Sequence, residues 1–245
     1  MTLPDDSDKD LSWLDLSYRK SVVVTKSQLA RRYIQRLILT GAIHPGDRLT
    51  TREVSTALGI SETPIREAIN GLAAEGWLDL QSHIGAVVRA LDIDQIREIS
   101  ALRGMICELA IELNATRYDA AFIAELDANI AQSFAALEAG DYDTFGGLNA
   151  QFHRMLCDGP NSQYSYRILE NMLGLMSSGR HGIPTYRERL DAAIQEHCRI
   201  RDLLAAGDYR GAARLARQHE INTGEFLMRK MRELEAMREP AASPA

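Results

Sequence analysis

One stretch, residues 48–75, constrains the fold most, because it encodes two short helices and a tight turn between them. Thr50 and Glu53 have the spacing of a capping box, so a helix should begin there. Gly59 should end this helix, since glycine accepts the left-handed conformation that closes many helices. Ser61 is then placed to cap a second helix. The stretch therefore predicts a helix-turn-helix.

The second of these helices has one apolar and one polar face. Its apolar positions recur at the i, i+3, i+4, i+7 spacing of a buried stripe: Ile65, Ala68, Ile69 and Leu72. Thr63, Arg66 and Asn70 should then point outward. A short helix that presents such side chains beside a supporting helix is typical of proteins that read the major groove of DNA.

The flanking segments complete a winged helix. A helix is predicted over 27–40, and the strand-like runs 77–80 and 86–88 follow the motif with a turn between them. His83, in that turn, is predicted to be an exposed turn residue rather than a ligand, in a position that could still reach a phosphate or the minor groove. The arginines of the first helix lie off its inner face, where they are either solvated or in contact with phosphates, and the adjacent motif favours phosphate for at least one: Arg31, Arg32 and Arg36.

Two segments carry a family resemblance. Residues 45–49 read Pro-Gly-Asp-Arg-Leu, and residues 61–68 read Ser-Glu-Thr-Pro-Ile-Arg-Glu-Ala. Together they resemble the winged-helix DNA-binding domain of the GntR family. We predict that the DNA-binding residues are Arg31, Arg52, Thr63, Arg66, Asn70, His83 and Gly85. The family usually has a basic residue directly after the serine of the recognition helix. This chain has Glu62 there, which predicts a different operator preference.

Length and charge indicate two domains. The chain has 245 residues, 45% of them hydrophobic, which is more than one winged helix requires. Its net charge of −6 is unevenly distributed, because residues 17–90 carry 10 Lys or Arg and 6 Asp or Glu. DNA phosphates require only such a local basic region. The sequence predicts a mainly α protein, with a disordered tail at 1–24, a winged helix-turn-helix with a small β wing at 25–90, an all-helical bundle at 91–239 and a frayed end at 240–245.

The sequence also favours a cytoplasmic location. No run of 18 apolar residues predicts a membrane span, and the acidic N-terminal residues lack the apolar stretch of a signal peptide. Cys107, Cys157 and Cys198 are odd in number and widely spaced, which indicates reduced, mostly buried thiols.

Histidines in the second domain raise the possibility of a metal site. Asn149 and His153 are four residues apart and share one face of a predicted helix. His197 and His219 lie inside two later predicted helices. Each histidine alone is more often a core or surface residue than a ligand. Three that converge would suit zinc or nickel, so spacing alone leaves both interpretations open.

A second resemblance bears on this choice. The segments Asn149-Ala-Gln-Phe-His153, Glu196-His197 and Gln218-His219 resemble the FCD ligand-binding domain of the FadR subfamily of GntR regulators. The resemblance implies a helical bundle that holds a divalent metal through Asp or Asn and three histidines, here Asn149, His153, His197 and His219. Asn149 stands where the family often has aspartate. Cys107 stands where the family often has glutamate, and we interpret it as a packing residue.

These features predict a DNA-binding transcription regulator, a repressor that binds a palindromic operator as a homodimer. A small carboxylate effector would bind at the metal, with Arg103 and Arg180 as counter-charges unless they lie on a solvated face. Two alternatives remain: a metal-dependent enzyme fused to a DNA-binding domain, and a DNA binder with a purely structural metal. The chain lacks the His-Glu-x-x-His motif and a phosphate-binding glycine loop, so we do not expect an enzyme.

Overall fold

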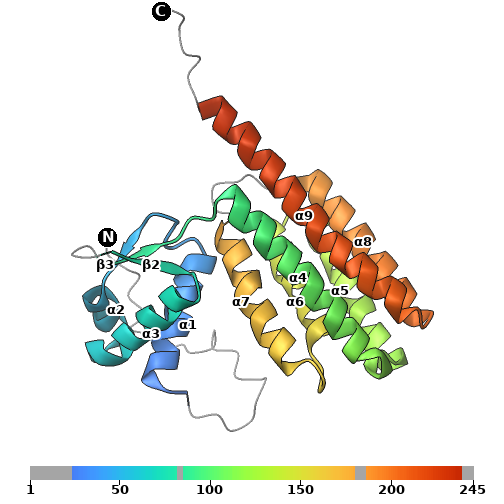
Figure 1. Ribbon diagram of the computed structural model, residues 1–245, viewed down its shortest axis with the longest axis horizontal. Coiled ribbons are helices and arrows are strands. Elements are labelled where there is room, and N and C mark those ends of the chain that lie inside the picture. The colour runs from blue at the N-terminus through green and yellow to red at the C-terminus, as the bar shows by residue number, and fades with distance from the viewer. Residues whose placement is uncertain (1–23, 82–84, 180–185, 239–245) are drawn as a thin grey trace, which may run out of the picture. The chain divides into compact units, whose positions relative to one another are not determined.

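The computed structural model describes residues 24–81, 85–179 and 186–238, which form two compact units (Figure 1). The boundary between the units along the chain lies between Leu91 and Asp92. The predicted tail, His83, Arg180 and the predicted frayed end lie outside the described residues, apart from Val24 at the end of the tail. The fold class is as predicted: mainly helical, with a small sheet in the first unit and, among the described residues, only helices in the second.

The first unit is a winged helix. Its elements are α1 (Lys26–Leu39), β1 (Arg48–Leu49), α2 (Thr51–Leu58), α3 (Glu62–Ala74), β2 (Leu78–Gln81) and β3 (Gly85–Val88). The capping box of Thr50 and Glu53 is formed at the start of α2. Gly59 ends that helix in the left-handed conformation, with φ of 61°. One detail differs from the prediction: Ser61 is the N-cap residue of α3, but its side chain makes no capping hydrogen bond.

The sheet has three antiparallel strands in the order β1-β3-β2. The sequence predicted β2 and β3 but not β1, which is only two residues long and therefore has no alternating pattern to detect. Arg48 and Leu49 pair with Val87 and Ala86. This pairing attaches the wing to the segment that leads into α2.

The second unit consists of helices. They are α4 (Ile93–Leu113), the 3-10 turn η2 (Ala115–Arg117), α5 (Ala120–Ala139), α6 (Tyr142–Cys157), α7 (Gln163–Gly179), α8 (Arg187–Ala205) and α9 (Tyr209–Arg238). Helix α4 ends at Leu113 and does not continue through Arg117. The Asn114 amide instead donates to the carbonyl of Ala110 and to the Ser162 hydroxyl, and this polar side chain turns the chain.

The core of the second unit is an apolar cluster contributed by α4 to α9, with Cys107, Phe152 and Ile200 fully buried. Helices α4 and α9 lie side by side (Figure 1). Gly104 permits this approach, because a Cβ at this position would lie 3.0 Å from the backbone oxygen of Arg217. Among the described helices, none has the length and hydrophobicity that crossing a bilayer requires.

Candidate DNA-binding surface and buried histidine site

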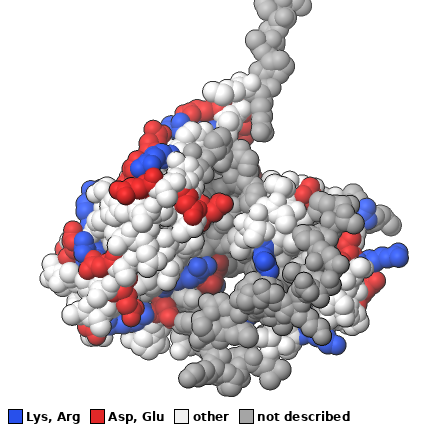
Figure 2. All heavy atoms as spheres, turned by 180° about the vertical axis from the view of Figure 1, so that it is seen from behind, with Lys and Arg blue, Asp and Glu red and all other residues white. Residues whose placement is uncertain are grey.

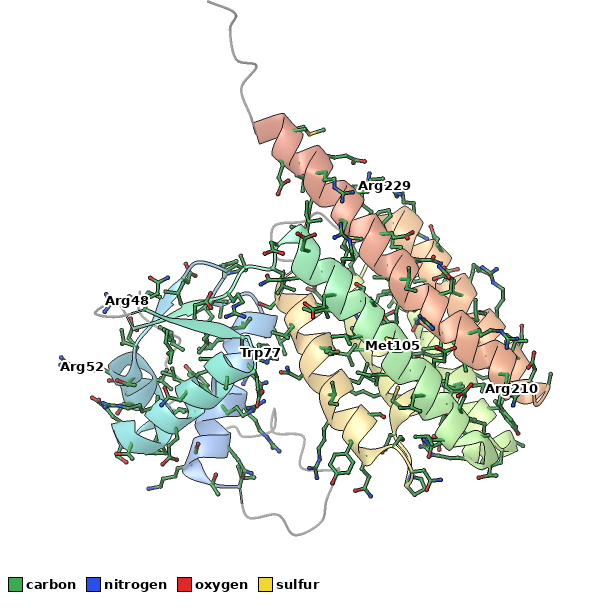
Figure 3. All side chains as sticks on the ribbon, in the orientation of Figure 1. Arg48, Arg52, Trp77, Met105, Arg210 and Arg229 are labelled. Atoms are coloured by element: carbon green, nitrogen blue, oxygen red, sulfur yellow. The ribbon has the colours of Figure 1, made fainter. Side chains whose placement is uncertain are left out.

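Helix α3 presents its polar face to solvent. Thr63, Arg66 and Asn70 are exposed, and Arg66 has 69% of its side chain accessible. The opposite face is buried against the other helices of the winged unit, as predicted: Ile65, Ala68, Ile69 and Leu72. Arg52 on α2 is also exposed, and Figure 3 shows it projecting away from the winged unit. These side chains are available to a ligand as large as DNA.

Glu62 lies within reach of this surface. Its carboxylate is 3.8 Å from the Arg66 guanidinium and accepts a hydrogen bond of 3.3 Å from the Thr51 hydroxyl. An opposite charge at this distance partly balances the positive charge of Arg66.

Arg31 has an internal partner. Both ends of its guanidinium bond to the two carboxylate oxygens of Glu75 at the end of α3. This pair connects α1 to α3 inside the winged unit. The predicted phosphate contact of Arg31 stays a prediction, and it would have to be made beside a carboxylate that already balances its charge.

The wing requires its glycine. Gly85 has φ of +110°, and a Cβ there would lie 3.3 Å from the backbone oxygen of Leu49. The same position is 3.7 Å from Nε of Arg48, an exposed arginine that the sequence analysis did not select. Figure 3 shows the Arg48 side chain projecting from the winged unit. The sequence could have pointed to Arg48 only as a basic residue on strand β1, and that strand is too short to be predicted.

In the second unit, three histidines from different helices come together. They are His153 on α6, His197 on α8 and His219 on α9, and their exposed fractions are only 2%, 1% and 2%. One ring nitrogen from each lies within 4.8 Å of those of the other two. The His197 ring also stacks on Phe152, with 3.8 Å between ring centroids, which fixes its orientation. This arrangement is compact enough for one ion to contact all three rings.

Two carboxylates orient these histidines. Nδ1 of His153 lies 3.1 Å from Glu220, and Nδ1 of His219 lies 2.6 Å from Glu196. Nε2 of His153 and Nε2 of His197 are buried and have no hydrogen-bond partner within the described residues. Buried ring nitrogens without partners are costly, and metal-binding histidines typically donate their other ring nitrogen to a carboxylate. The donor set therefore fits a divalent metal.

The electrostatics favour the ligating form of the rings. Burial, followed by the positive charge of His219 and then that of Arg103, lowers the pKa of His153 well below its ordinary value. Burial and the charges of His219 and His153 do the same to the pKa of His197. Both rings are therefore neutral at physiological pH and can donate a lone pair to a cation.

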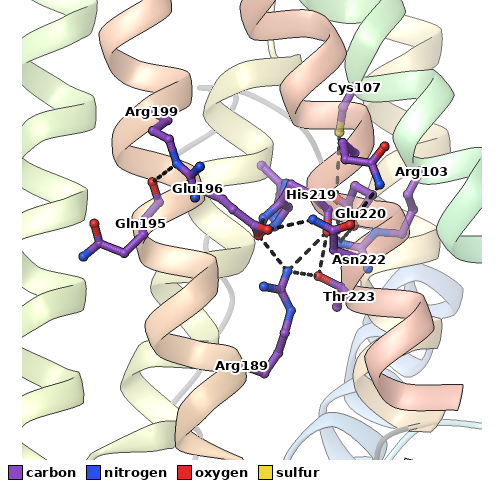
Figure 4. A network of polar contacts seen from close by, with 12 residues as sticks. Arg103, Cys107, Arg189, Gln195, Glu196, Arg199, His219, Glu220, Asn222 and Thr223 are labelled. Atoms are coloured by element: carbon purple, nitrogen blue, oxygen red, sulfur yellow. Dashed lines mark hydrogen bonds and ion pairs between the residues drawn. The ribbon is translucent and has the colours of Figure 1, made fainter. Parts of the chain in front are cut away.

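The Glu196 carboxylate is held by a network that Figure 4 shows. Arg189 donates to Glu196 at 2.9 Å and to the Thr223 hydroxyl at 2.6 Å, and Asn222 donates to Glu196 at 2.8 Å. Burial raises the pKa of Glu196, but the hydrogen bond and charge of His219, with Arg189, outweigh it and lower the pKa to about 2. Glu196 is therefore an anion at neutral pH, and it accepts hydrogen bonds from its neighbours.

Arg103 does not lie on a solvated face, and that alternative was wrong. It is 5% exposed, and its Nη2 lies 2.9 Å from both carboxylate oxygens of Glu220. Its Nε is buried without a hydrogen-bond partner among the described residues. The same is true of Nε of Arg189, whose side chain is 11% exposed, so the structure adds Arg189 to Arg103 as a largely buried guanidinium near the histidines.

Asn149 lies one helical turn before His153 on α6 and is half-buried, and its role as fourth ligand stays a prediction. Cys107 is fully buried, with its sulfur 3.6 Å from that of Cys157 and 4.0 Å from Glu220. The hydrogen bond with Cys157 and burial raise the pKa of Cys107, so it is a neutral thiol in the core. This agrees with a packing role.

The sequence did not reveal the residues that support the histidines through hydrogen bonds and ion pairs, which are Arg189, Glu196, Glu220, Asn222 and Thr223. A signal for two of them was present, because Glu196 precedes His197 and Glu220 follows His219. Neither glutamate supports the histidine beside it in sequence. Each reaches a histidine on another helix, and only the fold reveals that.

Comparison with known proteins agrees with this architecture. The model of the gntR family of bacterial regulatory proteins matches residues 26–88, and the FCD domain model matches residues 98–222. The HTH-type transcriptional repressor RspR of Escherichia coli is 27% identical over 79% of this chain and 85% of its own length. The HTH-type transcriptional regulator YdhC of Bacillus subtilis is 27% identical over 68% and 75%. The structure of E. coli McbR/YncC superposes with a TM-score of 0.74, at 21% identity, over 86% of this chain and all of that one.

Proposed function

The chain belongs to the GntR family of bacterial regulatory proteins, with a winged helix followed by an FCD domain, and from this premise we propose how it regulates transcription. It acts in the cytoplasm as a repressor, and two copies bind a palindromic operator because one recognition helix covers only a half-site. Thr63, Arg66 and Asn70 contact base edges. Arg48, Arg52 and the wing contact the phosphate backbone and the groove beside it.

The second unit holds a divalent metal, zinc or nickel, through His153, His197 and His219, with Asn149 as the fourth ligand. The observation that carries this proposal is the pair of buried, unpartnered Nε2 atoms on two of three converging histidines. Neutral imidazoles suit such borderline ions. Glu196 and Glu220 fix the rings of His219 and His153 from behind.

A small organic acid is the effector. Four neutral ligands leave the charge of a divalent ion uncompensated, and a carboxylate supplies both an oxygen donor and a negative charge. The buried guanidinium of Arg103 and the largely buried one of Arg189 would add to the attraction, although Glu220 and Glu196 already balance them in part. Arg180 lies outside the described residues, and its part in effector binding is carried over from the sequence alone.

The enzyme alternative is the weaker one. The relatives are regulators, and a hydrolytic metal site requires a general base beside the open coordination position. Glu196 and Glu220 are each bonded to a histidine and an arginine, which makes them supports of the ligands.

The function is tested by selecting duplexes from a random DNA pool with the full-length protein, followed by gel-shift titration of the selected duplex and a scrambled control. We expect an inverted repeat and a clear preference for it over the scrambled duplex. Equal affinity for both duplexes would contradict sequence-specific regulation. A screen for turnover with added metal tests the enzyme alternative.

A further inference from the structure

Two cysteines lie in contact in the core of the second unit, beside the buried histidines. Cys107 on α4 and Cys157 on α6 are both fully buried, and their sulfur atoms are 3.6 Å apart. Figure 4 shows the Cys107 side chain pointing toward Glu220, and its sulfur lies 4.0 Å from Oε1 of that residue. The proposed function uses neither thiol.

A ring nitrogen completes this group of donors. Nδ1 of His153 lies 3.1 Å from Oε1 of Glu220, and one donor atom from each of Cys107, His153 and Glu220 lies within 4.8 Å of the other two. His153 and Cys157 are four residues apart on α6, so they share one face of that helix. Three helices therefore bring together two sulfur atoms, one nitrogen and one oxygen. We call these four residues the thiol cluster: Cys107, His153, Cys157 and Glu220.

The distances within the thiol cluster resemble those around one metal ion. A tetrahedral ion with bonds of about 2.3 Å to sulfur and about 2.1 Å to nitrogen or oxygen separates neighbouring donors by about 3.4–3.8 Å. The sulfur–sulfur, sulfur–oxygen and nitrogen–oxygen distances in the cluster are 3.6, 4.0 and 3.1 Å. Small shifts of these side chains would bring their donor atoms to a single ion.

The charges would also balance around a divalent ion. Arg103 is buried against Glu220, and the two charges of this pair cancel. A divalent cation adds two positive charges, and two thiols that release their protons to solvent on binding add two negative charges. The buried cluster then stays neutral, which avoids the cost of an uncompensated charge in the core.

Releasing the thiol protons has a cost. The hydrogen bond with Cys157 and burial raise the pKa of Cys107, so both groups are thiols until an ion binds. A coordinated thiol loses its proton to the metal ion. Because this cost lowers the affinity, we expect the cluster to fill when the ion is supplied and to lose it on dialysis.

The thiol cluster and the three-histidine site differ in the ions they suit, and they share one residue. Sulfur donors select soft ions, whereas imidazoles suit borderline ions. Nδ1 of His153 faces the thiol cluster, and its Nε2 is the unpartnered atom assigned to the three-histidine site. A neutral imidazole has only one nitrogen with a free lone pair, so His153 can serve one site at a time.

We propose that the thiol cluster is a second metal site, which takes a soft divalent cation such as cadmium and thereby empties the three-histidine site. The existence of the second site is independent of the proposed function, and only the exclusion rests on it. A soft cation would act on the regulator by removing His153 from the other ion.

The test adds Cd²⁺ to the reduced, metal-free, full-length protein and records the ultraviolet band of thiolate-to-cadmium charge transfer. We expect the band to saturate at about one ion per chain. Cys107→Ser and Cys157→Ser should each weaken it, and the double serine variant should abolish it. Cys198→Ala is the matched control and should keep the full band, because Cys198 on α8 is the third cysteine and lies outside the cluster.

Carboxylates on the surface do not imitate this result. Figure 2 shows acidic side chains distributed over the outside of the helical unit, and their oxygen donors bind cadmium without a thiolate band. A wild-type protein that shows no band, whether or not it binds cadmium, would overturn the proposal. A band that is lost in Cys198→Ala and retained in the double serine variant would also overturn it.

A second measurement keeps the proposal testable if the serine variants do not fold. X-ray absorption of cadmium bound to the wild-type protein counts its sulfur neighbours, and we expect two. A cadmium ion surrounded only by nitrogen and oxygen would overturn the proposal.

The exclusion is tested with the zinc-loaded protein. Cadmium should release zinc from the wild-type protein but not from the double serine variant. Uptake of cadmium at the thiols with full retention of zinc would overturn the exclusion. Failure of the proposed function would look different, because it would leave the thiolate band intact in a protein without a preferred DNA sequence.

Discussion

The winged unit exposes its polar side chains, whereas the second unit buries several of its own. Every buried polar or charged side chain that the structure describes lies between Ser100 and Glu220, in the helical part of the chain that begins with α4. Within the described part of the winged unit, the buried side chains are apolar, and the candidate DNA contacts Thr63, Arg66 and Asn70 are exposed. The polar chemistry of the winged unit is therefore exposed to solvent, and that of the second unit is enclosed.

This difference has energetic consequences. Exposed charges on the winged unit interact through solvent, so their individual contributions are small and depend on salt. The buried histidines, glutamates and arginines of the second unit interact where water is excluded, so removing one leaves others unpaired at a larger cost. Substitutions in the second unit should therefore have the larger effects.

The largest effect should come from the histidines. The purified protein should contain about one divalent metal per chain, and replacing His197 and His219 together by alanine should abolish it, because two imidazole donors are lost. Elemental analysis of the dialysed protein measures this. His44→Ala is the control, since His44 is 60% exposed in the winged unit, and it should retain the metal. Full metal content in the double variant would show that other residues are the ligands.

The second-largest effect should come from the exposed face of α3. Arg66→Ala should weaken binding to the selected operator by about 1–3 kcal/mol, the value of a good contact to a base edge, and weaken binding to scrambled DNA less. Gel-shift titrations at one salt concentration compare the two duplexes. Arg210→Ala, an exposed arginine on α9, should change neither affinity. An equal loss on both duplexes would instead assign Arg66 to a phosphate contact.

Acid should weaken the second unit through its buried histidines. Burial is the main reason why the pKa values of His153 and His197 are lowered in the folded protein. On unfolding, both histidines regain the ordinary pKa of 6.5. Below that pH the unfolded chain binds more protons, so the free energy of unfolding of the metal-free protein should fall by up to about 1.4 kcal/mol per pH unit for each histidine. Urea unfolding at pH 7.5, 6 and 5, buffer values we choose to bracket the transition, measures the slope.

His197→Phe is the control for this slope, because a phenyl ring can still stack on Phe152 but takes up no proton. The variant should show a smaller loss of stability between pH 6.5 and 5 than the unsubstituted protein. Identical slopes would mean that His197 is not protonated on unfolding in this range.

The smallest effect should come from Glu62. Replacing it by glutamine removes a negative charge 3.8 Å from Arg66, so affinity for any duplex should rise by a few-fold at low salt. Measuring the affinity at several salt concentrations separates this charge effect from a change in base preference. Unchanged affinity at low salt would show that Glu62 does not oppose phosphate binding.

The same comparison explains what the sequence could predict. The winged unit depends on local signals, such as the Thr50 capping box and the left-handed Gly59, and these lie within a few residues of the structure they determine. The faces of α3 followed from helical periodicity for the same reason. The two-residue strand β1 escaped because its only signal is its pairing with β3 across the wing.

The buried site could be predicted only in part. The convergence of His153, His197 and His219 was proposed from a family resemblance, because these residues lie far apart in sequence. The contacts Glu220–His153 and Arg103–Glu220 connect α6 to α9 and α4 to α9, and no periodicity encodes them. Whether an arginine such as Arg103 is solvated or buried in an ion pair depends on how neighbouring helices rotate, which one sequence does not determine.

The central claim is that the buried site of the second unit controls the affinity of the first unit for DNA. Calorimetric titration of small organic acids into the metal-loaded protein, with and without the selected operator, tests it most directly. We predict that an acid which requires His197 and His219 for binding will bind more weakly in the presence of operator. The expected coupling is ~1–3 kcal/mol, and the acid should weaken operator binding by the same factor. An acid that binds at the metal with equal affinity in both titrations would contradict this account and leave the metal as a structural element only.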